Sequence, residues 1–259
     1  MLILLPPSEG KSAPRRGKPL DLPSLSFPSL TSAREEVLDA LVSLCEGDRE
    51  KAVATLGIGH TLAAEVDRNA ALRTASTTRA DRVYTGVLYE ALDLPGLEGA
   101  AKRRATSWLA VASGLFGLLR PSDRVPAYRL SGDVSLPGLG TVSTYWARHL
   151  DAAVREAAGR GLVIDLRSST YTPFWRPTPD VAKKVATMRV LHEVDGTRKV
   201  VSHFNKATKG RIVRALLEDG TAPSSPARLA DHLRVLGWTV EVGAAGKAGT
   251  QLDVVVSDL

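Results

Sequence analysis

The sequence predicts an α/β fold in which a mixed sheet is surrounded by helices, and three observations point to this class. Short apolar segments typical of buried strands alternate with longer segments whose apolar residues recur at helical spacing. A hairpin signal in the carboxyl-terminal third adds antiparallel strands to the expected sheet. The chain has 259 residues, a common length for one α/β unit, so we expect a single domain over residues 1–259.

Composition limits the classes of function. The formal net charge is +6, from 34 Lys and Arg against 28 Asp and Glu, which favours anionic partners such as nucleic acid or phosphorylated metabolites. A basic surface with no specific partner is the plain alternative. Cys45 is the one cysteine, which excludes an internal disulfide and predicts a reducing compartment, the cytoplasm. No apolar run has the length of a signal peptide core or a membrane span, so we expect no membrane association.

The amino terminus predicts a buried strand and a polar loop. Leu2–Leu5 is apolar and ends at Pro6, and the loop that follows contains Ser8, Glu9 and Lys11. A Gly-Lys-Ser loop after a strand suggests phosphate binding. A P-loop would need glycine where Leu5 stands, and prolines interrupt the helix that should follow. A Walker-type nucleotide site is therefore not predicted.

The next hundred residues predict helices and one special turn. A helix is expected from Ser32, with a capping box to Glu35 and Cys45 on its core face. Residues 48–73 contain Gly57 and Gly59 in an apolar-Gly-apolar-Gly pattern that resembles a helix-hairpin-helix module, whose free backbone N–H groups hold a DNA phosphate. A plain pair of helices needs similar glycines, so both interpretations stay open.

The middle of the chain carries the strongest local signal. We expect a strand over residues 82–89, which includes Tyr84, and a helix over residues 100–119 that is buried in its later part. Beyond it, Arg120, Arg124 and Arg129 alternate with prolines and Tyr128. Cations on a rigid turn directly after a core segment suit an anionic ligand.

The carboxyl-terminal part predicts the remaining sheet. A helix is expected over residues 144–158, and a strand over residues 162–166 whose end carries Asp165, Arg167, Ser168 and Tyr171, where sites of open α/β sheets gather. Residues 188–194 and 197–204 predict a hairpin with an Asp195-Gly196 turn. A helix from Lys206 carries Lys209 and Arg211 in its first turns; cations there oppose the helix dipole, so we expect Lys206 and Lys209 to face an anion. A helix over 226–236 and strands over 238–242 and 252–256 complete the sheet.

Several blocks of this sequence resemble the YaaA family of bacterial peroxide stress proteins. They are the amino-terminal Leu-Ile-Leu-Leu-Pro-Pro-Ser-Glu-Gly-Lys, residues 83–86, 113–121, 126–130 and 201–211. The resemblance implies a mixed α/β body with an embedded helix-hairpin-helix and a positively charged cleft. It further implies binding to DNA, including distorted or single-stranded forms, and protection from peroxide and iron damage. It also makes Ser8, Glu9 and Lys11 candidate site residues.

Two functional hypotheses follow. The first is sequence-independent binding of DNA phosphates in a basic cleft where Lys11, Arg120, Arg129, Lys206 and Lys209 converge. Its expected contacts are Ser8, Lys11, Gly57, Gly59, Tyr84, Arg120, Tyr128, Arg129, Lys206, Lys209 and Arg211. The alternative is an enzyme that acts on a nucleotide-like or phosphate-bearing small molecule in the same cleft, with Glu9 as general base or as a ligand to a metal bound with the phosphates. The histidine spacing matches no metal motif, so we expect no metal and no cofactor. An interaction protein whose basic face only maintains solubility is a third option.

Overall fold

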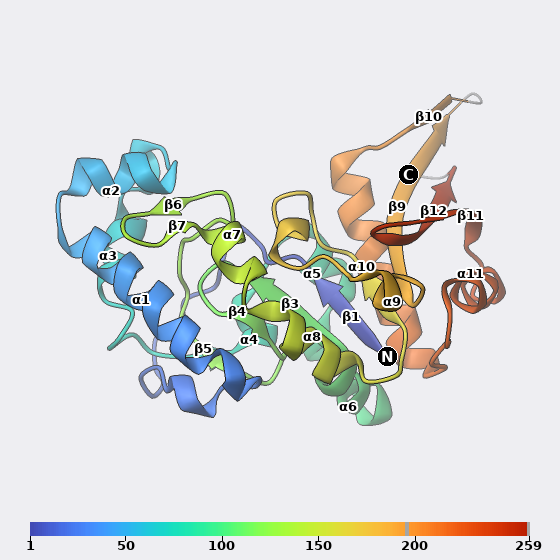
Figure 1. Ribbon diagram of the computed structural model, residues 1–259, viewed down its shortest axis with the longest axis horizontal. Coiled ribbons are helices and arrows are strands. Elements are labelled where there is room, and N and C mark those ends of the chain that lie inside the picture. Colours follow the sequence, from blue (N-terminus) through green and yellow to red (C-terminus); the bar gives the residue numbers. More distant parts are fainter. Residues whose placement is uncertain (195–196, 258–259) are drawn as a thin grey trace.

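A mainly parallel sheet forms the centre of the molecule (Figure 1). In the computed structural model, which describes residues 1–194 and 197–257, this sheet has eight strands in the order β11-β12-β9-β8-β1-β3-β4, with β10 beside β9. Their bounds are β1 Leu2–Leu5, β3 Leu109–Ser113, β4 Gly117–Leu119, β8 Val163–Asp165, β9 Val185–Val194, β10 Thr197–Lys199, β11 Thr239–Gly246 and β12 Gly249–Val256. Two small sheets pair β2 (Thr78–Arg79) with β5 (Arg124–Val125) and β6 (Ser135–Leu136) with β7 (Gly140–Thr141).

Strand β1 lies between two parallel neighbours. Ile3 is opposite Leu109 of β3 on one side and Ile164 of β8 on the other. The residues of β1 are almost completely buried, as an apolar strand in the middle of a parallel sheet requires. Because β1, β3 and β8 run in the same direction, their carboxyl ends meet at one border of the sheet, which we call the carboxyl edge.

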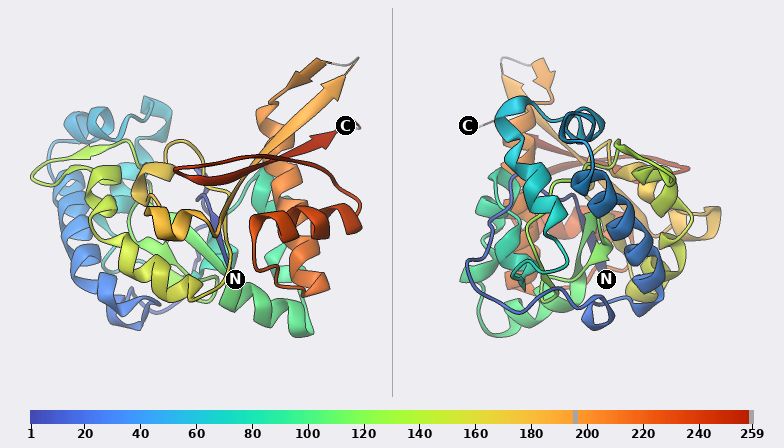
Figure 2. Two further views of the ribbon diagram at one scale, coloured as in Figure 1. Left: turned by 45° about the vertical axis from the view of Figure 1, so that its right-hand side comes forward. Right: turned by 90° about the vertical axis from the view of Figure 1, so that its left-hand side faces the viewer.

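Eleven α-helices surround this sheet in the described part of the chain (Figures 1 and 2). They are α1 Thr31–Glu46, α2 Arg49–Leu56, α3 Ala64–Ala70, α4 Ala80–Val83, α5 Val87–Leu92, α6 Gly99–Trp108, α7 Val142–Ala147, α8 Leu150–Ala158, α9 Pro179–Ala182, α10 Ser202–Asp219 and α11 Pro226–Val235. Helices α1 to α3 lie at the end of the molecule opposite α11 in both figures. The predicted class, a mixed α/β fold in one body, is confirmed.

The segment between β3 and β4 packs tightly against α7. Trp146 donates from its indole N–H to the Gly114 carbonyl oxygen at 2.7 Å. Gly117 has a φ of 70°, and a Cβ atom there would lie 2.6 Å from the Trp146 ring. A Cβ atom on Gly114 would lie 2.4 Å from the Leu130 carbonyl oxygen. The two glycines therefore permit a close approach that no larger residue allows.

Three predictions of secondary structure, two helices and one strand, need correction. The helix expected over residues 100–119 ends at Trp108, and the apolar run that follows forms β3 and β4, because a short buried strand has the same composition as a buried helix. Residues 82–89 belong to α4 and α5 rather than to a strand. Helix α1 begins at Thr31, and its cap residue Leu30 makes no side-chain hydrogen bond, so the capping box at Ser32 is wrong.

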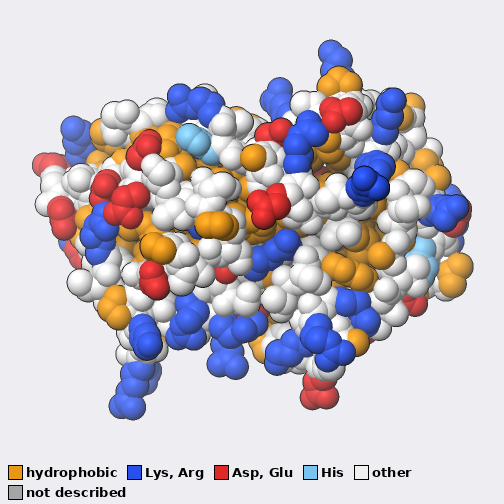
Figure 3. All heavy atoms as spheres, turned by 60° about the horizontal axis from the view of Figure 1, so that its bottom comes forward, with side chains coloured by type: hydrophobic (Ala, Val, Ile, Leu, Met, Phe, Trp, Pro, Cys, Tyr) orange, Lys and Arg blue, Asp and Glu red, His pale blue; other side chains and the backbone are white. Residues whose placement is uncertain are grey.

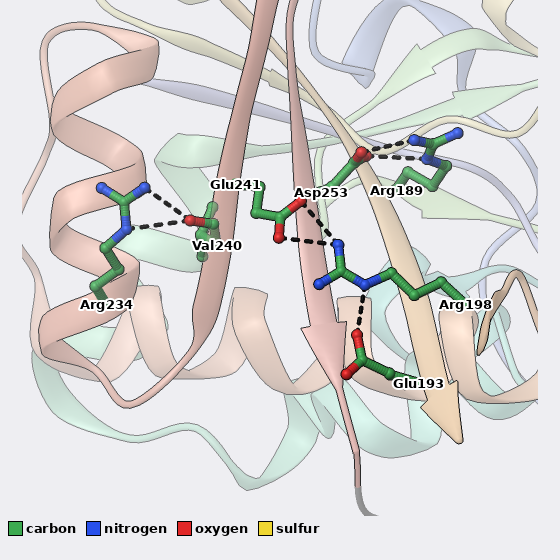
Figure 4. Close-up of polar contacts among 7 residues, drawn as sticks. All are labelled: Arg189, Glu193, Arg198, Arg234, Val240, Glu241 and Asp253. Atoms are coloured by element: carbon green, nitrogen blue, oxygen red, sulfur yellow. Dashed lines mark hydrogen bonds and ion pairs between the residues drawn. The ribbon is translucent and has the colours of Figure 1, made fainter. Parts of the chain in front are cut away.

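The carboxyl-terminal strands form the predicted hairpin. Strands β9 and β10 pair antiparallel, which confirms it, while the Asp195-Gly196 turn lies outside the described residues. Ion pairs link the strands of this region: Arg198 of β10 pairs with Glu193 of β9 and Glu241 of β11, and Arg189 of β9 pairs with Asp253 of β12 (Figure 4). The strand predicted to continue to residue 204 ends at Lys199, since α10 begins at Ser202.

Within the ranges that the structure describes, we find no helix with both the length and the apolar character that crossing a bilayer demands.

Candidate functional site

The loop after β1 is fixed at the carboxyl edge by short polar contacts. The Ser8 hydroxyl donates to the Gly10 carbonyl oxygen at 2.6 Å and accepts from the Thr85 backbone N–H at 3.0 Å. The Thr85 hydroxyl also donates to the Gly10 carbonyl oxygen at 3.0 Å. Lys11 forms an isolated β-bridge with Tyr84. These contacts hold the backbone of the loop up to Lys11 in place.

Lys11 places its amine over aromatic rings. Its Nζ atom donates to the Ser8 carbonyl oxygen at 2.7 Å and lies 4.4 Å from the Tyr128 ring centroid and 5.7 Å from that of Tyr84. Among the residues with described positions, no carboxylate lies within 4.0 Å of this amine. Burial lowers the Lys11 pKa from 10.5 to about 8. A neutral amine is therefore accessible near neutral pH.

Other charges act on this amine from neighbouring elements. Glu9 of the same loop and Glu65 of α3 favour its protonated form, and Arg129 and Arg68 oppose it. Arg68 pairs with Glu65, and Arg129 pairs with Glu9, so each cation near Lys11 stands beside a carboxylate. Burial thus remains the main cause of the low Lys11 pKa.

A chain of hydroxyl groups lies beside Lys11. The Tyr84 and Tyr128 hydroxyl oxygens are 3.2 Å apart, and the Tyr128 oxygen is 2.7 Å from Ser113 Oγ at the end of β3. Ser113 Oγ in turn accepts from the Phe116 backbone N–H at 3.0 Å. Burial raises the pKa of Tyr84 and Tyr128, so both phenols stay protonated at physiological pH.

Two further tyrosines complete this cluster. Tyr89 stacks on Tyr84 with ring centroids 5.4 Å apart and donates to the Pro6 carbonyl oxygen at 2.6 Å. The buried Tyr171 lies close enough to Tyr128 and Glu9 for their charges to raise its pKa, although burial is the larger cause. Of the five tyrosines in the sequence, four therefore gather where the described strand β1 ends.

Arg129 is a partly buried cation whose charge acts on Lys11. Its backbone N–H donates to Asn69 Oδ1 at 2.9 Å, and Asn69 Nδ2 donates to the Arg129 carbonyl oxygen at 2.8 Å. Its Nη2 atom pairs with Glu9 Oε2 at 2.6 Å. The Arg129 side chain is 23% exposed, whereas the Glu9 side chain is 65% exposed. An arginine with a fixed backbone thus pairs with a carboxylate that stands mostly in solvent.

A polar hollow of about 380 Å³ lies beside this pair. Its walls come from the loop after β1, the turn after α2, and the segment after Tyr128. The lining residues are Glu9, Thr55, Leu56, Gly57, Arg129, Ser131, Asp133, Val134 and Ser135. Three residues predicted from sequence, Glu9, Gly57 and Arg129, meet here although they are far apart in the chain. Tyr84 and Tyr89 line a second hollow of about 440 Å³.

At the end of β8 the carboxyl edge carries a buried ion pair. Arg167 donates to both carboxylate oxygens of Asp165, at 2.8 and 2.7 Å, and also to the carbonyl oxygens of Tyr171 and Trp175. Its guanidinium is thereby engaged with the protein itself. Lys209 of α10 lies near Asp165, which raises the Lys209 pKa, but burial lowers it by more. The lysine predicted to face an anion thus faces Asp165.

The structure does not bring every predicted cation to this edge. Arg120 donates to the carbonyl oxygens of Ser107 and Leu109, at the amino end of β3, and lies 5.0 Å from the Phe27 ring centroid. Its charge, after burial, lowers the pKa of the Met1 amino group. Arg120 is therefore at the opposite border of the sheet from Lys11. On α10, Lys206 and Arg211 are exposed.

Residues 48–73 form two short helices, α2 and α3, and a turn. Gly57 ends α2 with a φ of 61°, and its N–H bonds to the Ala54 carbonyl oxygen. A 3₁₀ turn, His60–Leu62, separates Gly59 from α3. Arg49 of α2 pairs with Asp67 of α3 at 2.6 Å. The structure shows the pair of helices, and the finer helix-hairpin-helix assignment stays a prediction.

Surface charge is mixed. Figure 3 shows Lys and Arg side chains spread over one face, many along its lower border, with Asp and Glu side chains between them. At the α2–α3 end, Arg73 pairs with both Glu35 and Asp39. The expected basic cleft is therefore not evident from the described contacts.

Three contributors to this site were not predicted. Ser113 anchors Tyr128, Tyr89 stacks on Tyr84, and Asn69 fixes Arg129. A polar residue at the end of an apolar strand was the available signal for Ser113. Asn69 lies within a short helix and gives no signal, since its partner is 60 residues away.

Comparison with known proteins gives the family. The family model described as peroxide stress protein YaaA matches residues 1–242. This chain belongs to the YaaA family. A UPF0246 protein of Streptomyces coelicolor is 55% identical over 261 residues and covers 100% of both chains. One from Corynebacterium efficiens is 45% identical over 249 residues, which is 95% of this chain and 97% of that protein. The predicted family is thus confirmed, and the names of these relatives state no ligand and no reaction.

Proposed function

We propose that this YaaA-family protein binds a nucleotide-like or phosphate-bearing small molecule at the carboxyl edge, in the hollow beside Arg129, and that it serves peroxide stress through that ligand. The observation that carries the proposal is the Arg129–Glu9 pair. Asn69 holds the Arg129 backbone, and the Arg129 guanidinium pairs with an exposed carboxylate at 2.6 Å on the wall of a hollow.

The Arg129–Glu9 pair resembles an anion-binding site in which a carboxylate of the protein itself occupies the place of the ligand. The arginine fork matches a phosphate as well as a carboxylate, and both bind through two parallel hydrogen bonds. Since the Glu9 side chain is 65% exposed, its ion pair contributes little, and an incoming phosphate displaces it at small cost. Lys11 and Lys209 add positive charge at the same edge of the sheet.

The size of the hollow favours a small ligand. A volume of about 380 Å³ falls in the range of about 300–1,000 Å³ that small-molecule pockets occupy. Asp133 and Glu9 both line it, and two carboxylates oppose the approach of a long polyanion. A single phosphate group needs to displace only one of them.

A thermal stability series tests this proposal. Inorganic phosphate, pyrophosphate, AMP and ADP are added separately to the native chain, to R129M and to R189M. Arg189 is the matched control, because it lies on β9 and pairs with Asp253 of β12, and neither residue lines the hollow. We expect ligand at 100 times its Kd for the native chain to stabilise the native chain and R189M by about 2.7 kcal/mol, and R129M by no more than about 1.4 kcal/mol. Equal stabilisation of R129M, or none of the native chain by any of the four, contradicts the proposal.

DNA is the second candidate. The net charge of +6, the exposed Lys206 and Arg211, and the Gly57 turn in the same hollow as Arg129 support it. Phosphate contacts release counterions, so binding to duplex, bulged or single-stranded DNA should ignore sequence and weaken steeply with salt. Gel shifts measure this. Absent or salt-independent binding to DNA removes this candidate. If E9A binds DNA more tightly than the native chain does, and no nucleotide stabilises the chain, DNA rather than a small molecule is the ligand.

A further inference from the structure

We infer that Lys11 is a nucleophilic amine that forms an imine with an aldehyde or ketone group of the ligand. This inference rests on the proposed function, since Arg129 would hold the phosphate of the same molecule. It adds a reaction, and a class of substrate, to a site for which phosphate binding alone was proposed.

The surroundings of the amine favour attack over ion pairing. Lys11 Nζ has one short hydrogen bond, to the Ser8 carbonyl oxygen at 2.7 Å, and a long contact of 3.5 Å to the Glu9 carbonyl oxygen. Two tyrosine rings cover it on another side. Backbone carbonyls only accept, so they orient the amine and leave its lone pair for an electrophile when it is neutral.

Two features keep a fraction of this amine neutral. Desolvation disfavours the ammonium form, and the Arg129 and Arg68 charges act in the same direction. Glu9 and Glu65 act against them, but each is engaged in an ion pair with one of these two arginines. A desolvated lysine beside another cation is the arrangement that activates amine nucleophiles in enzymes.

The buried hydroxyl chain fixes the rings that cover the amine. Tyr84, Tyr128 and Ser113 are hydrogen-bonded to one another. The Lys11 amine lies over the Tyr128 and Tyr84 rings, which shield it from water on that side. This cluster therefore makes the Lys11 position different from an exposed lysine such as Lys206.

The step balances without an added oxidant or reductant. The Nζ lone pair forms a bond to the carbonyl carbon, the C=O π electrons move to oxygen, and a proton passes from nitrogen to that oxygen. The carbinolamine then loses its hydroxyl group and the remaining N–H proton as water, which leaves the C=N bond. Amine and carbonyl thus yield imine and water.

Reductive trapping tests the inference on the full chain. Limiting glyceraldehyde 3-phosphate and sodium borohydride are added to the native chain, K11R and K18R, and adducts are located by peptide mass mapping. Borohydride delivers hydride to the imine carbon and fixes the adduct. We expect the native chain and K18R to carry most of the label on Lys11, and K11R to lose it. Label spread evenly over the lysines overturns the inference.

A pH series separates a reactive amine from a merely accessible one. Trapping at Lys11 should rise with pH about a midpoint near 8, where its amine loses its proton. A midpoint at the ordinary lysine value of 10.5 overturns the inference. The melting temperature and the total label of K11M are measured alongside. A folded K11M whose total label falls to a small fraction of that of the native chain supports the inference, and a folded K11M that keeps the native total overturns it.

Failure of the inference is distinguishable from failure of the proposed function. If phosphate or ADP stabilises K11R as it does the native chain, while neither protein is trapped at residue 11, the binding site stands and the imine does not. If trapping at Lys11 persists in R129M with unchanged efficiency, the amine is reactive but Arg129 does not hold the phosphate, and the link between the two proposals is wrong.

Discussion

At the scale of single residues, buried charges decide what the carboxyl edge can do. Arg167 uses its guanidinium on Asp165 and two carbonyl oxygens, so it supports the loop after β8. Arg129 has an exposed partner and is open to exchange. The sequence predicts both arginines near a site, because both follow apolar segments. It does not predict their different roles, which depend on contacts with Asp165 and Asn69.

Loss of the buried pair should destabilise the fold. In R167M the Asp165 carboxylate stays buried without its partner, so we expect the free energy of unfolding to fall by about 3–5 kcal/mol. Urea denaturation measures this change. The R189M substitution breaks the exposed pair with Asp253 and should lower the free energy of unfolding by no more than about 1 kcal/mol. Equal losses in the two variants would show that burial of the Asp165–Arg167 pair has no special weight.

Lys11 should make stability depend on pH in a defined window. Its folded-state pKa of about 8 lies below the ordinary 10.5, so the unfolded chain binds more protons between these values. The free energy of unfolding of the native chain, minus that of K11M, should therefore rise as pH rises from 8 to 10.5 and stay flat below 8. Urea titrations across this window measure it. A flat or falling difference would contradict the burial of this amine.

At the scale of elements, the strands bounded by turn residues were predicted, and the strand that continues an apolar run from a helix was not. Strands β1 and β8 and the β9–β10 hairpin follow from apolar runs and turn residues. Strand β3 was predicted as helix, since Leu109–Ser113 continues an apolar run that begins in α6. Its partner strands β1 and β4 determine its form, and their positions are tertiary information.

Gly117 offers a test of the packing around β3 and β4. In G117A the new methyl group would meet the Trp146 ring and occupy a φ of 70°, so we expect a loss of about 1–3 kcal/mol in unfolding free energy. G138A is the matched control, because Gly138 has a φ of 74° with no atom within 4 Å of its Cβ position. The denaturation midpoints of G117A and G138A, each compared with that of the native chain, measure the two losses. Should G138A lose as much as G117A, backbone strain rather than contact with Trp146 explains the effect.

At the scale of the whole molecule, the order of strands creates the site. Strand β1 lies between β3 and β8. The carboxyl edge therefore brings together the loop after β1, the Tyr128 side chain that is hydrogen-bonded to Ser113 at the end of β3, and Asp165 at the end of β8. Lys11, Tyr84, Tyr128 and Arg129 were each predicted as site residues, and they lie together. Arg120 was predicted with them and lies at the other border, because the turn that carries it follows β4, which runs antiparallel to β3. Spacing along the chain does not reveal that reversal.

The most direct test of the anion site is the dissociation constant for ADP, measured by isothermal titration calorimetry on the native chain, E9Q and R129M. Removing the carboxylate that competes for the guanidinium should leave E9Q binding at least as tightly as the native chain. R129M should bind at least about tenfold more weakly, a difference of about 1.4 kcal/mol. Unchanged affinity in R129M, or loss of binding in E9Q, would contradict the account of Arg129 as a phosphate site that Glu9 occupies.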